Sequence, residues 1–191
     1  MPLNCRSLLP GAALALLLLG LPPRAQAQPV LAPTRDVDIT YQVTRPHQAR
    51  IRERVRWLAA EHLERIDGPD KSVTIFDRKG NEITLLIPAT RTYRKLEGAP
   101  RRPTEPEADA VLTRGGESAI AGQRCVEWSW IEDTETRTLC ATADGVVLRL
   151  VVGGKTVMEA RSVSYGRQNP ELFKAPPNYM PALAPEGGTG P

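Results

Sequence analysis

The sequence predicts one mainly β domain, built from short strands of an antiparallel sheet. Three observations predict this class. Apolar and polar residues alternate with a period of two in several segments. Turn-forming pairs such as Asp144 and Gly145 separate these segments. Cys125 and Cys140 lie in strand-like sequence around a polar turn. The pattern indicates a meander of strands with minor helix.

The N-terminus is typical of a secretory signal. Residues 1–27 combine Arg6, an apolar stretch over 11–21 and small residues before a cleavage site after Ala27. The stretch is shorter than the roughly 20 residues that span a bilayer, so we expect no transmembrane segment after its removal. We predict a bacterial protein that is periplasmic or secreted, with a lead over 28–35, a single domain over 36–180 and a disordered tail over 181–191.

The charge of the expected mature chain gives no sign of a nucleic-acid partner. Removing Arg6 and Arg24 from the 25 basic residues leaves 23, against 22 acidic residues. The basic excess lies between 45 and 102, where no stacking aromatics are interleaved with the arginines. An exported protein also meets little nucleic acid, and we expect none as a partner.

The first predicted strand covers 37–43, with Val37, Ile39, Tyr41 and Val43 on one face. The stretch that follows is ambiguous. Residues 50–67 show near-helical apolar spacing, but they also alternate between arginine and apolar residues as two strands with a turn near Ala60 would. Periodicity leaves both interpretations open and leans slightly to the helix.

The remaining elements are mostly strands. We expect them at 71–77, 82–88 and 91–96, then in a hairpin around 132–133, at 146–152 and at 155–165. Three prolines mark residues 98–108 as a loop, and a short helix is expected over 105–114. Asn169 followed by Pro170 suits the start of a helical turn.

The two cysteines left after cleavage are predicted to form a structural disulfide, because exported proteins are oxidised. A hairpin that turns around Glu132 and Asp133 would place Cys125 directly opposite Cys140. The same register would place Trp128 opposite Arg137, where guanidinium and indole could stack. The alternatives are a redox pair and a metal site. His47 and His62, the chain's only histidines, are far away in sequence.

Several phrases resemble a group of exported bacterial proteins of unknown function whose fold is similar to the lipoprotein-carrier (LolA-like) half-barrel. These phrases are "AGQRCVEW", "LCATADGVVLR" and "LFKAPPNY", and the likeness extends from about Val37 to Tyr179. The resemblance implies a strongly curved antiparallel sheet with an apolar concave face that helices cover. It implies two strands over 50–67, and a hollow that holds acyl chains in relatives. This chain departs by having only a short Pro-rich insert around 103–114 in place of longer lid helices.

Two sets of candidate residues follow. An aromatic and aliphatic set would line the concave face: Tyr41, Trp57, Phe76, Leu85, Trp128 and Trp130. The alternative for these residues is an ordinary sheet core. A basic row would occupy one face if 50–67 forms strands: Arg50, Arg52, Arg54 and Arg56. It could meet lipid phosphates or an acidic partner. The alternative is a solvated face paired with acids such as Glu61 and Glu64.

The sequence offers little for catalysis. It has no serine in a nucleophile elbow, no glycine-rich phosphate loop and no acid at helpful spacing from either histidine. We expect no catalytic residues, no metal and no cofactor. The predicted function is non-enzymatic binding of an apolar or amphiphilic ligand, such as a lipid or an acylated protein. The alternative is a cell-envelope interaction domain with a solid core, and an enzyme or accessory factor is a weaker third hypothesis.

Overall fold

The structure is a computed structural model that describes residues 28–45 and 49–182. The predicted signal over 1–27 and most of the predicted tail lie outside the described residues. The tail is expected from 181, but Pro181 belongs to the last strand, and the Ala182 N–H donates to Tyr93 O at 2.7 Å.

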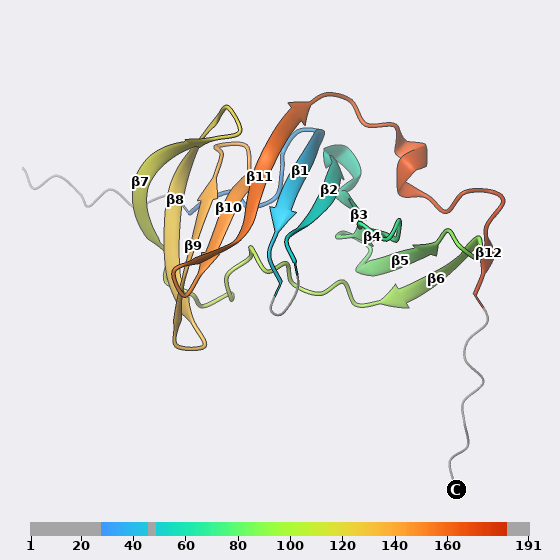
Figure 1. The fold of residues 1–191 in the computed structure, drawn as a ribbon, viewed down its shortest axis with the longest axis horizontal. Helices are drawn as coiled ribbons and strands as arrows, with labels where there is room; N and C mark the ends of the chain where they lie inside the picture. The colour runs from blue at the N-terminus through green and yellow to red at the C-terminus, as the bar shows by residue number, and fades with distance from the viewer. Residues whose placement is uncertain (1–27, 46–48, 183–191) are drawn as a thin grey trace, which may run out of the picture.

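One open sheet of twelve strands makes up the domain, which confirms the predicted mainly β class (Figure 1). The strands follow the order β12-β6-β5-β4-β3-β2-β1-β11-β10-β9-β8-β7, and all pairs are antiparallel except β12 with β6. The strands are β1 (Val37–Val43), β2 (Ile51–Leu58), β3 (Leu63–Asp67), β4 (Val73–Asp77), β5 (Glu82–Ile87), β6 (Thr92–Glu97), β7 (Thr113–Ile120), β8 (Gln123–Glu132), β9 (Glu135–Ala141), β10 (Val147–Val152), β11 (Lys155–Tyr165) and β12 (Met180–Pro181).

Two meanders meet at the centre of the sheet. β2 to β6 form one, β7 to β11 form the other, and β1 joins them by pairing with both β2 and β11. The chain must therefore cross from β6 on one side to β7 at the far edge. Residues 98–112 make this crossing below the sheet in Figure 1. The helix predicted over 105–114 is wrong, because this segment forms turns and then enters β7 at Thr113.

Residues 50–67 form two strands, so the helical alternative is wrong. A single 3-10 turn, η1 (Ala59–Glu61), separates β2 from β3, and His62 closes it with a left-handed φ of 55°. Periodicity could not decide between the two structures. Pairing with β1 decides it, because β2 lies along the whole length of β1, from Val37 opposite Trp57 to Val43 opposite Ile51.

The predicted disulfide between Cys125 and Cys140 is present, with the Cα atoms 5.4 Å apart. The predicted register is wrong by two residues. Glu132 faces Glu135 across the turn, so Cys140 lies opposite Glu127. Trp128 lies opposite Leu139, and the predicted stacking with Arg137 does not occur because Arg137 faces Trp130. The cysteines are therefore bonded across an offset pair of positions.

The turn between β8 and β9 contains a local strain that substitution should relieve. Asp133 and Thr134 both have positive φ, 51° and 68°, as a two-residue hairpin turn of type I′ requires. Thr134 is β-branched and unfavourable there. Replacing the pair with Asn-Gly should raise the free energy of unfolding by about 1 kcal/mol. Thermal unfolding checks this, with Thr136→Gly in β9 as a control that should lower the melting temperature. A melting temperature unchanged by Asn-Gly would contradict the assignment of strain.

The outer face of the β3–β5 region is covered by the C-terminal segment. η2 (Pro170–Phe173) begins after Asn169, as the sequence predicted. The Asn169 side chain accepts a hydrogen bond from the Glu171 N–H at 3.0 Å. Phe173 is buried against a cluster on the outer face, which contains Leu58, Val73, Ile75 and Leu86. This packing covers the outer face only, and side chains on the opposite, inner face of β3 and β4 line a hollow.

Candidate functional site

A hollow of about 520 Å³ lies on the inner face of the sheet. Residues of β1, β2, β3, β4, β10 and β11 form its walls, and two irregular segments complete the lining. These segments are residues 31–33 of the lead and residues 100–104, here called the strap. The lining side chains are mainly apolar, which suits an apolar part of a ligand. The aliphatic ones are Leu31, Ile39, Val43, Val55, Ile66, Val146, Val147, Leu150, Val157 and Met158.

The alternation of β1 positions one wall. Ile39, Tyr41 and Val43 point inward together, as predicted. The Tyr41 hydroxyl donates a hydrogen bond to Val147 O at 2.7 Å, across to β10. Burial raises the pKa of Tyr41 above its usual range. The phenol therefore stays neutral and satisfied, and it contributes an uncharged surface to the hollow.

The predicted aromatic set divides into two groups. Tyr41, Trp57 and Phe76 line the hollow. Trp128 and Trp130 instead fill a separate core cluster with Leu139 and Leu150. Leu85 is half-buried on β5 and is not among the lining residues. Whether the three aromatics in the hollow bind a ligand stays a prediction.

Sequence reasoning missed a buried ion pair in the same hollow. Glu64 on β3 is only 6% exposed, and Arg78, just after β4, donates to Glu64 Oε2 from Nε at 3.0 Å and from Nη2 at 2.6 Å. The guanidinium also covers the Phe76 ring, at 4.4 Å from its centroid. The pairing of β3 with β4 places Glu64 opposite Phe76. Glu64 also lies opposite Trp57 of β2, which faces the hollow. The sequence alone could reveal this position of Glu64 only if the register of β2 and β3 were known.

The strap is tied to the walls by arginines. The Arg78 Nη1 donates to Pro100 O at 2.7 Å. Arg102 donates from Nε to Glu105 at 2.8 Å and from Nη2 to Leu31 O at 2.9 Å, and its guanidinium lies 5.4 Å from the centre of the Trp57 ring. The Arg102 side chain thus contacts the strap, the lead and the inner wall at the same time.

A second anchor holds the strap at the far end of the sheet. Arg101 Nη2 donates to Glu132 at 2.8 Å, and the Trp130 Nε1–H donates to the same carboxylate at 2.9 Å. The hydrogen bond from Arg101, then that from Trp130, lowers the pKa of Glu132 from 4.5 to about 2. Glu132 therefore remains ionised even in mild acid.

This shifted pKa predicts a pH dependence of stability. A carboxylate whose pKa is lower in the folded than in the unfolded chain stabilises the fold at every pH above the pKa of the unfolded chain. This contribution is lost as the pH falls from 4.5 through about 2. We expect Glu132→Gln to remove it. Urea unfolding at a series of pH values should show the parent and the variant most different near neutrality and converging toward pH 2. Curves that stay parallel over this range would contradict the assignment.

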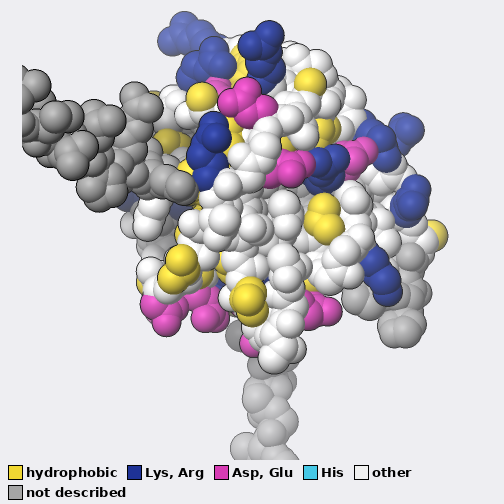
Figure 2. Space-filling model, turned by 90° about the vertical axis from the view of Figure 1, so that its left-hand side faces the viewer, with side chains coloured by type: hydrophobic (Ala, Val, Ile, Leu, Met, Phe, Trp, Pro, Cys, Tyr) yellow, Lys and Arg dark blue, Asp and Glu magenta, His cyan; other side chains and the backbone are white. Residues whose placement is uncertain are grey.

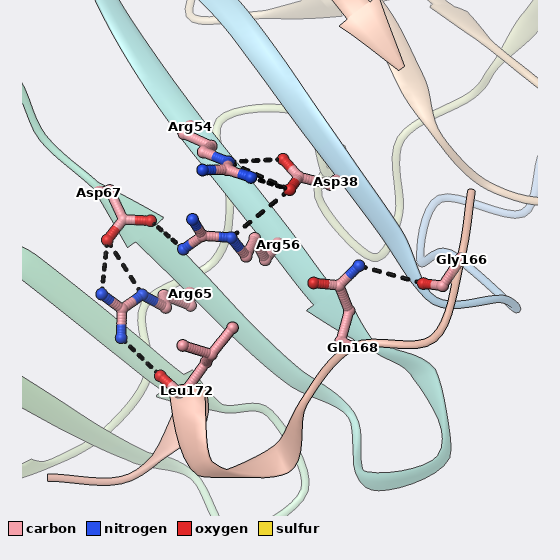
Figure 3. Close-up of polar contacts among 8 residues, drawn as sticks. All are labelled: Asp38, Arg54, Arg56, Arg65, Asp67, Gly166, Gln168 and Leu172. Atoms are coloured by element: carbon pink, nitrogen blue, oxygen red, sulfur yellow. Dashed lines mark hydrogen bonds and ion pairs between the residues drawn. The ribbon is translucent and has the colours of Figure 1, made fainter. Parts of the chain in front are cut away.

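The residues of the predicted basic row are not among those that line the hollow, and Figure 3 shows the contacts of two of them, Arg54 and Arg56. Arg54 donates from Nε to Asp38 at 2.9 Å, and Arg56 lies 3.5 Å from Asp38 and 2.5 Å from Asp67. Asp67 also binds Arg65, which in turn donates to Leu172 O at 2.6 Å. The expected acidic partners were wrong, because Glu64 points to the inner face. Arg54 and Arg56 thus join β2 to Asp38 on β1 and to Asp67 on β3, whereas Arg65 is the residue of this network that contacts the C-terminal segment.

Arg50 and Arg52 remain exposed on the same strand region. A role of the basic row in binding phosphates or an acidic partner stays a prediction. Among residues 28–45 and 49–182, no group of three or more histidine, cysteine, aspartate or glutamate side chains is arranged to hold a metal ion. No helix in the same residues is long and apolar enough to cross a membrane.

No protein-family model and no curated protein matches the sequence. Solved structures do match the fold. An uncharacterised conserved protein from Thermus thermophilus is 15% identical, with a TM-score of 0.56 over 78% of this chain and 90% of that one. MucB is 13% identical, with a TM-score of 0.55, and the alignment covers 82% of this chain and 64% of MucB.

MucB is matched again in the Pseudomonas aeruginosa MucA/MucB complex, at 14% identity and a TM-score of 0.55 over 78% of this chain and 58% of that one. This chain therefore spans less than two thirds of the length of MucB. A LolA superfamily protein from Nitrosomonas europaea is 9% identical, with a TM-score of 0.36. The likeness to the Thermus thermophilus protein and to MucB establishes one thing about this chain, namely its fold, an open and curved antiparallel sheet.

Proposed function

We propose that the protein is an exported, non-enzymatic binding protein of the bacterial periplasm, and that its hollow takes the apolar part of an amphiphilic ligand such as a lipid or an acylated protein. The observation that carries this proposal is the hollow itself. Its volume of about 520 Å³ falls within the range of small-molecule sites, and its walls are mainly aliphatic and aromatic. Export rests on the sequence of residues 1–27.

The polar groups of the hollow are compatible with an amphiphile. Each inward-facing charge already has a partner, Glu64 with Arg78 and Glu53 with Arg45, so an apolar chain meets no unpaired charge on entry. The strap also lines the hollow, and its Arg101 and Arg102 are likewise paired, with Glu132 and Glu105. Ligand and wall would thus match in polarity.

Native mass spectrometry of the purified protein, followed by organic extraction, tests this proposal. We expect a co-purifying lipid or acyl species, and uptake of a fluorescent fatty-acid analogue. Val55→Trp, which fills the hollow from β2, should abolish uptake, whereas Leu96→Trp on β6, outside the hollow, should leave it unchanged. A bare mass together with no uptake by the parent protein would refute the proposal.

A second candidate function is recognition of a protein partner in the cell envelope. Its support is that MucB, which has this fold, has been solved in complex with MucA. In this chain the C-terminal segment around "PPNY" or the charged outer face would supply the contact. Cross-linking in cells followed by pull-down tests it, and failure to recover a reproducible partner would count against it.

A further inference from the structure

A second, smaller hollow lies outside the first, between the end of the chain crossing and β8. This groove has a volume of about 350 Å³ and is lined by Glu107, Asp109, Ala110, Val111, Trp130, Ile131 and Glu132. Val111 and Ile131 are 84% and 75% exposed, more than any other large apolar side chain in the described part of the chain. Ala110 and Leu112 pack inward against the Trp128 cluster, which turns Val111 outward.

The backbone of Ile131 is open on the side of the groove. Glu132 and Glu135 flank a two-residue turn, and such flanking residues exchange both ladder hydrogen bonds. Pairs alternate along an antiparallel ladder, so the N–H and C=O of Ile131 point away from β9. β7 begins only at Thr113, opposite Ser129, and no backbone hydrogen bond joins Ile131 to Val111 within residues 28–45 and 49–182. The backbone N–H and C=O of Ile131 therefore have no partner strand within the described residues.

The rim of the groove is acidic. Glu107 and Asp109 line it and are exposed, and the exposed Asp133 and Glu135 lie beside it at the turn, next to Glu132 in sequence and in the ladder. Arg101 contacts the buried Glu132 and lies 3.8 Å from Glu107, and Arg137 contacts Glu132, which leaves Asp109, Asp133 and Glu135 without an ion pair in the described part of the chain. Figure 2 shows acidic side chains gathered at the lower end of this face, beside exposed apolar ones, and basic side chains at its upper end. The charge of the groove thus favours a cationic partner.

We propose that this groove binds an extended, basic peptide segment of a partner protein, which adds to β8 as a short strand. Its backbone would pair with the open N–H and C=O of Ile131, as in other cases of strand addition. An apolar side chain of the peptide would pack on Val111 and Ile131, and its flanking lysines or arginines would face the acidic rim. The site is separate from the inner hollow, so it does not depend on a ligand there.

A fluorescein-labelled peptide of alternating lysine and valine tests the proposal by fluorescence anisotropy on the full domain. We expect it to bind the parent, and Asp109→Lys combined with Val111→Arg to weaken binding by about tenfold or more. Glu171→Lys with Leu172→Arg makes the same charge change on η2 and should leave binding unchanged. Equal binding to the parent and the groove variant, or no binding to the parent, would overturn the proposal.

The strand-addition geometry has its own readout. A probe with alternate backbone amides N-methylated keeps its charge but loses donors, so its binding should be lost. In ¹⁵N-resolved NMR, the Ile131 amide resonance should shift on addition of the unmodified peptide. Undiminished binding of the methylated probe, an unmoved Ile131 resonance, or equal binding of an alternating glutamate and valine peptide would each overturn the proposal. The fatty-acid test of the inner hollow is unaffected by either result.

Discussion

Replacing Glu64 with leucine should lower the free energy of unfolding by about 3–5 kcal/mol, because it would leave the Arg78 guanidinium buried without its counter-charge. The side chains of Glu64 and Arg78 are only 8% and 16% exposed, so water cannot screen the lost interaction well. Arg78 would keep a hydrogen bond to Pro100 O and its place over Phe76. Urea unfolding at neutral pH, followed by tryptophan fluorescence, measures the loss.

A double variant separates the charge from the packing. Glu64→Leu together with Arg78→Met replaces the pair with apolar side chains of similar size, and such replacements are often close to neutral in stability. We therefore expect the double variant to recover most of the loss. Glu82→Leu is the matched control on an exposed pair, since Lys95 and Glu82 are 57% and 38% exposed, and it should cost less than about 1 kcal/mol. If Glu64→Leu costs no more than this control, the buried pair does not hold the inner wall together.

The double variant also bears on the hollow. Removing both charges would make the wall beside Phe76 wholly apolar and would free the strap at Pro100. The uptake of a fatty-acid analogue should then persist if the apolar wall is what binds. Loss of uptake in a stable double variant would mean that the ion pair, through its hold on the strap, shapes the opening.

The class of the fold could be predicted from the sequence, because the alternation of side chains between the two faces of a strand is visible in neighbouring residues. Val37, Ile39 and Tyr41 alternate in β1, and neighbouring residues alone reveal it. The structure of 50–67 could not be predicted from period alone. Arg54 and Arg56 in β2 pair with Asp38 on β1 and Asp67 on β3, and these contacts exist only once the three strands are paired. The register of β8 and β9 depends on positive φ at Asp133 and Thr134. Aspartate is a usual first residue of such a turn, but Thr134 stands where glycine usually marks it.

The hollow was predictable only where hydrophobicity and inward direction coincide. This condition holds for Tyr41, Trp57 and Phe76. Trp128 and Trp130 are also inward by period, but they pack in the other half of the sheet with Leu139 and Leu150. Glu64 and Arg78 were not predicted to line the hollow, because they are not hydrophobic. Charged side chains are expected to be exposed to solvent. The burial of Glu64 and Arg78 becomes favourable only after β3 pairs with β4 and brings them together.

Removing the disulfide should lower the free energy of unfolding by about 3 kcal/mol, which is what the chain-entropy model gives for a loop of this length. The two cysteines are 15 residues apart in sequence and are 3% and 1% exposed. Most of the sheet pairing lies outside this loop, so we expect Cys125→Ala/Cys140→Ala to keep the fold. Circular dichroism checks the fold, and urea unfolding measures the loss.

The reduced parent protein distinguishes the two contributions of the bond. Its thiols still fill the core beside Val146 and Leu148, so its lower stability reports only the lost constraint on the unfolded chain. The alanine variant also loses the buried sulfur atoms and should therefore be less stable than the reduced parent. Equal stability of the two would mean that the sulfurs add nothing to packing. An oxidised parent no more stable than the reduced one would refute the constraint, and the hairpin would then be held by its ladder and by the Glu127–Arg149 pair that faces Cys140 from both neighbouring strands.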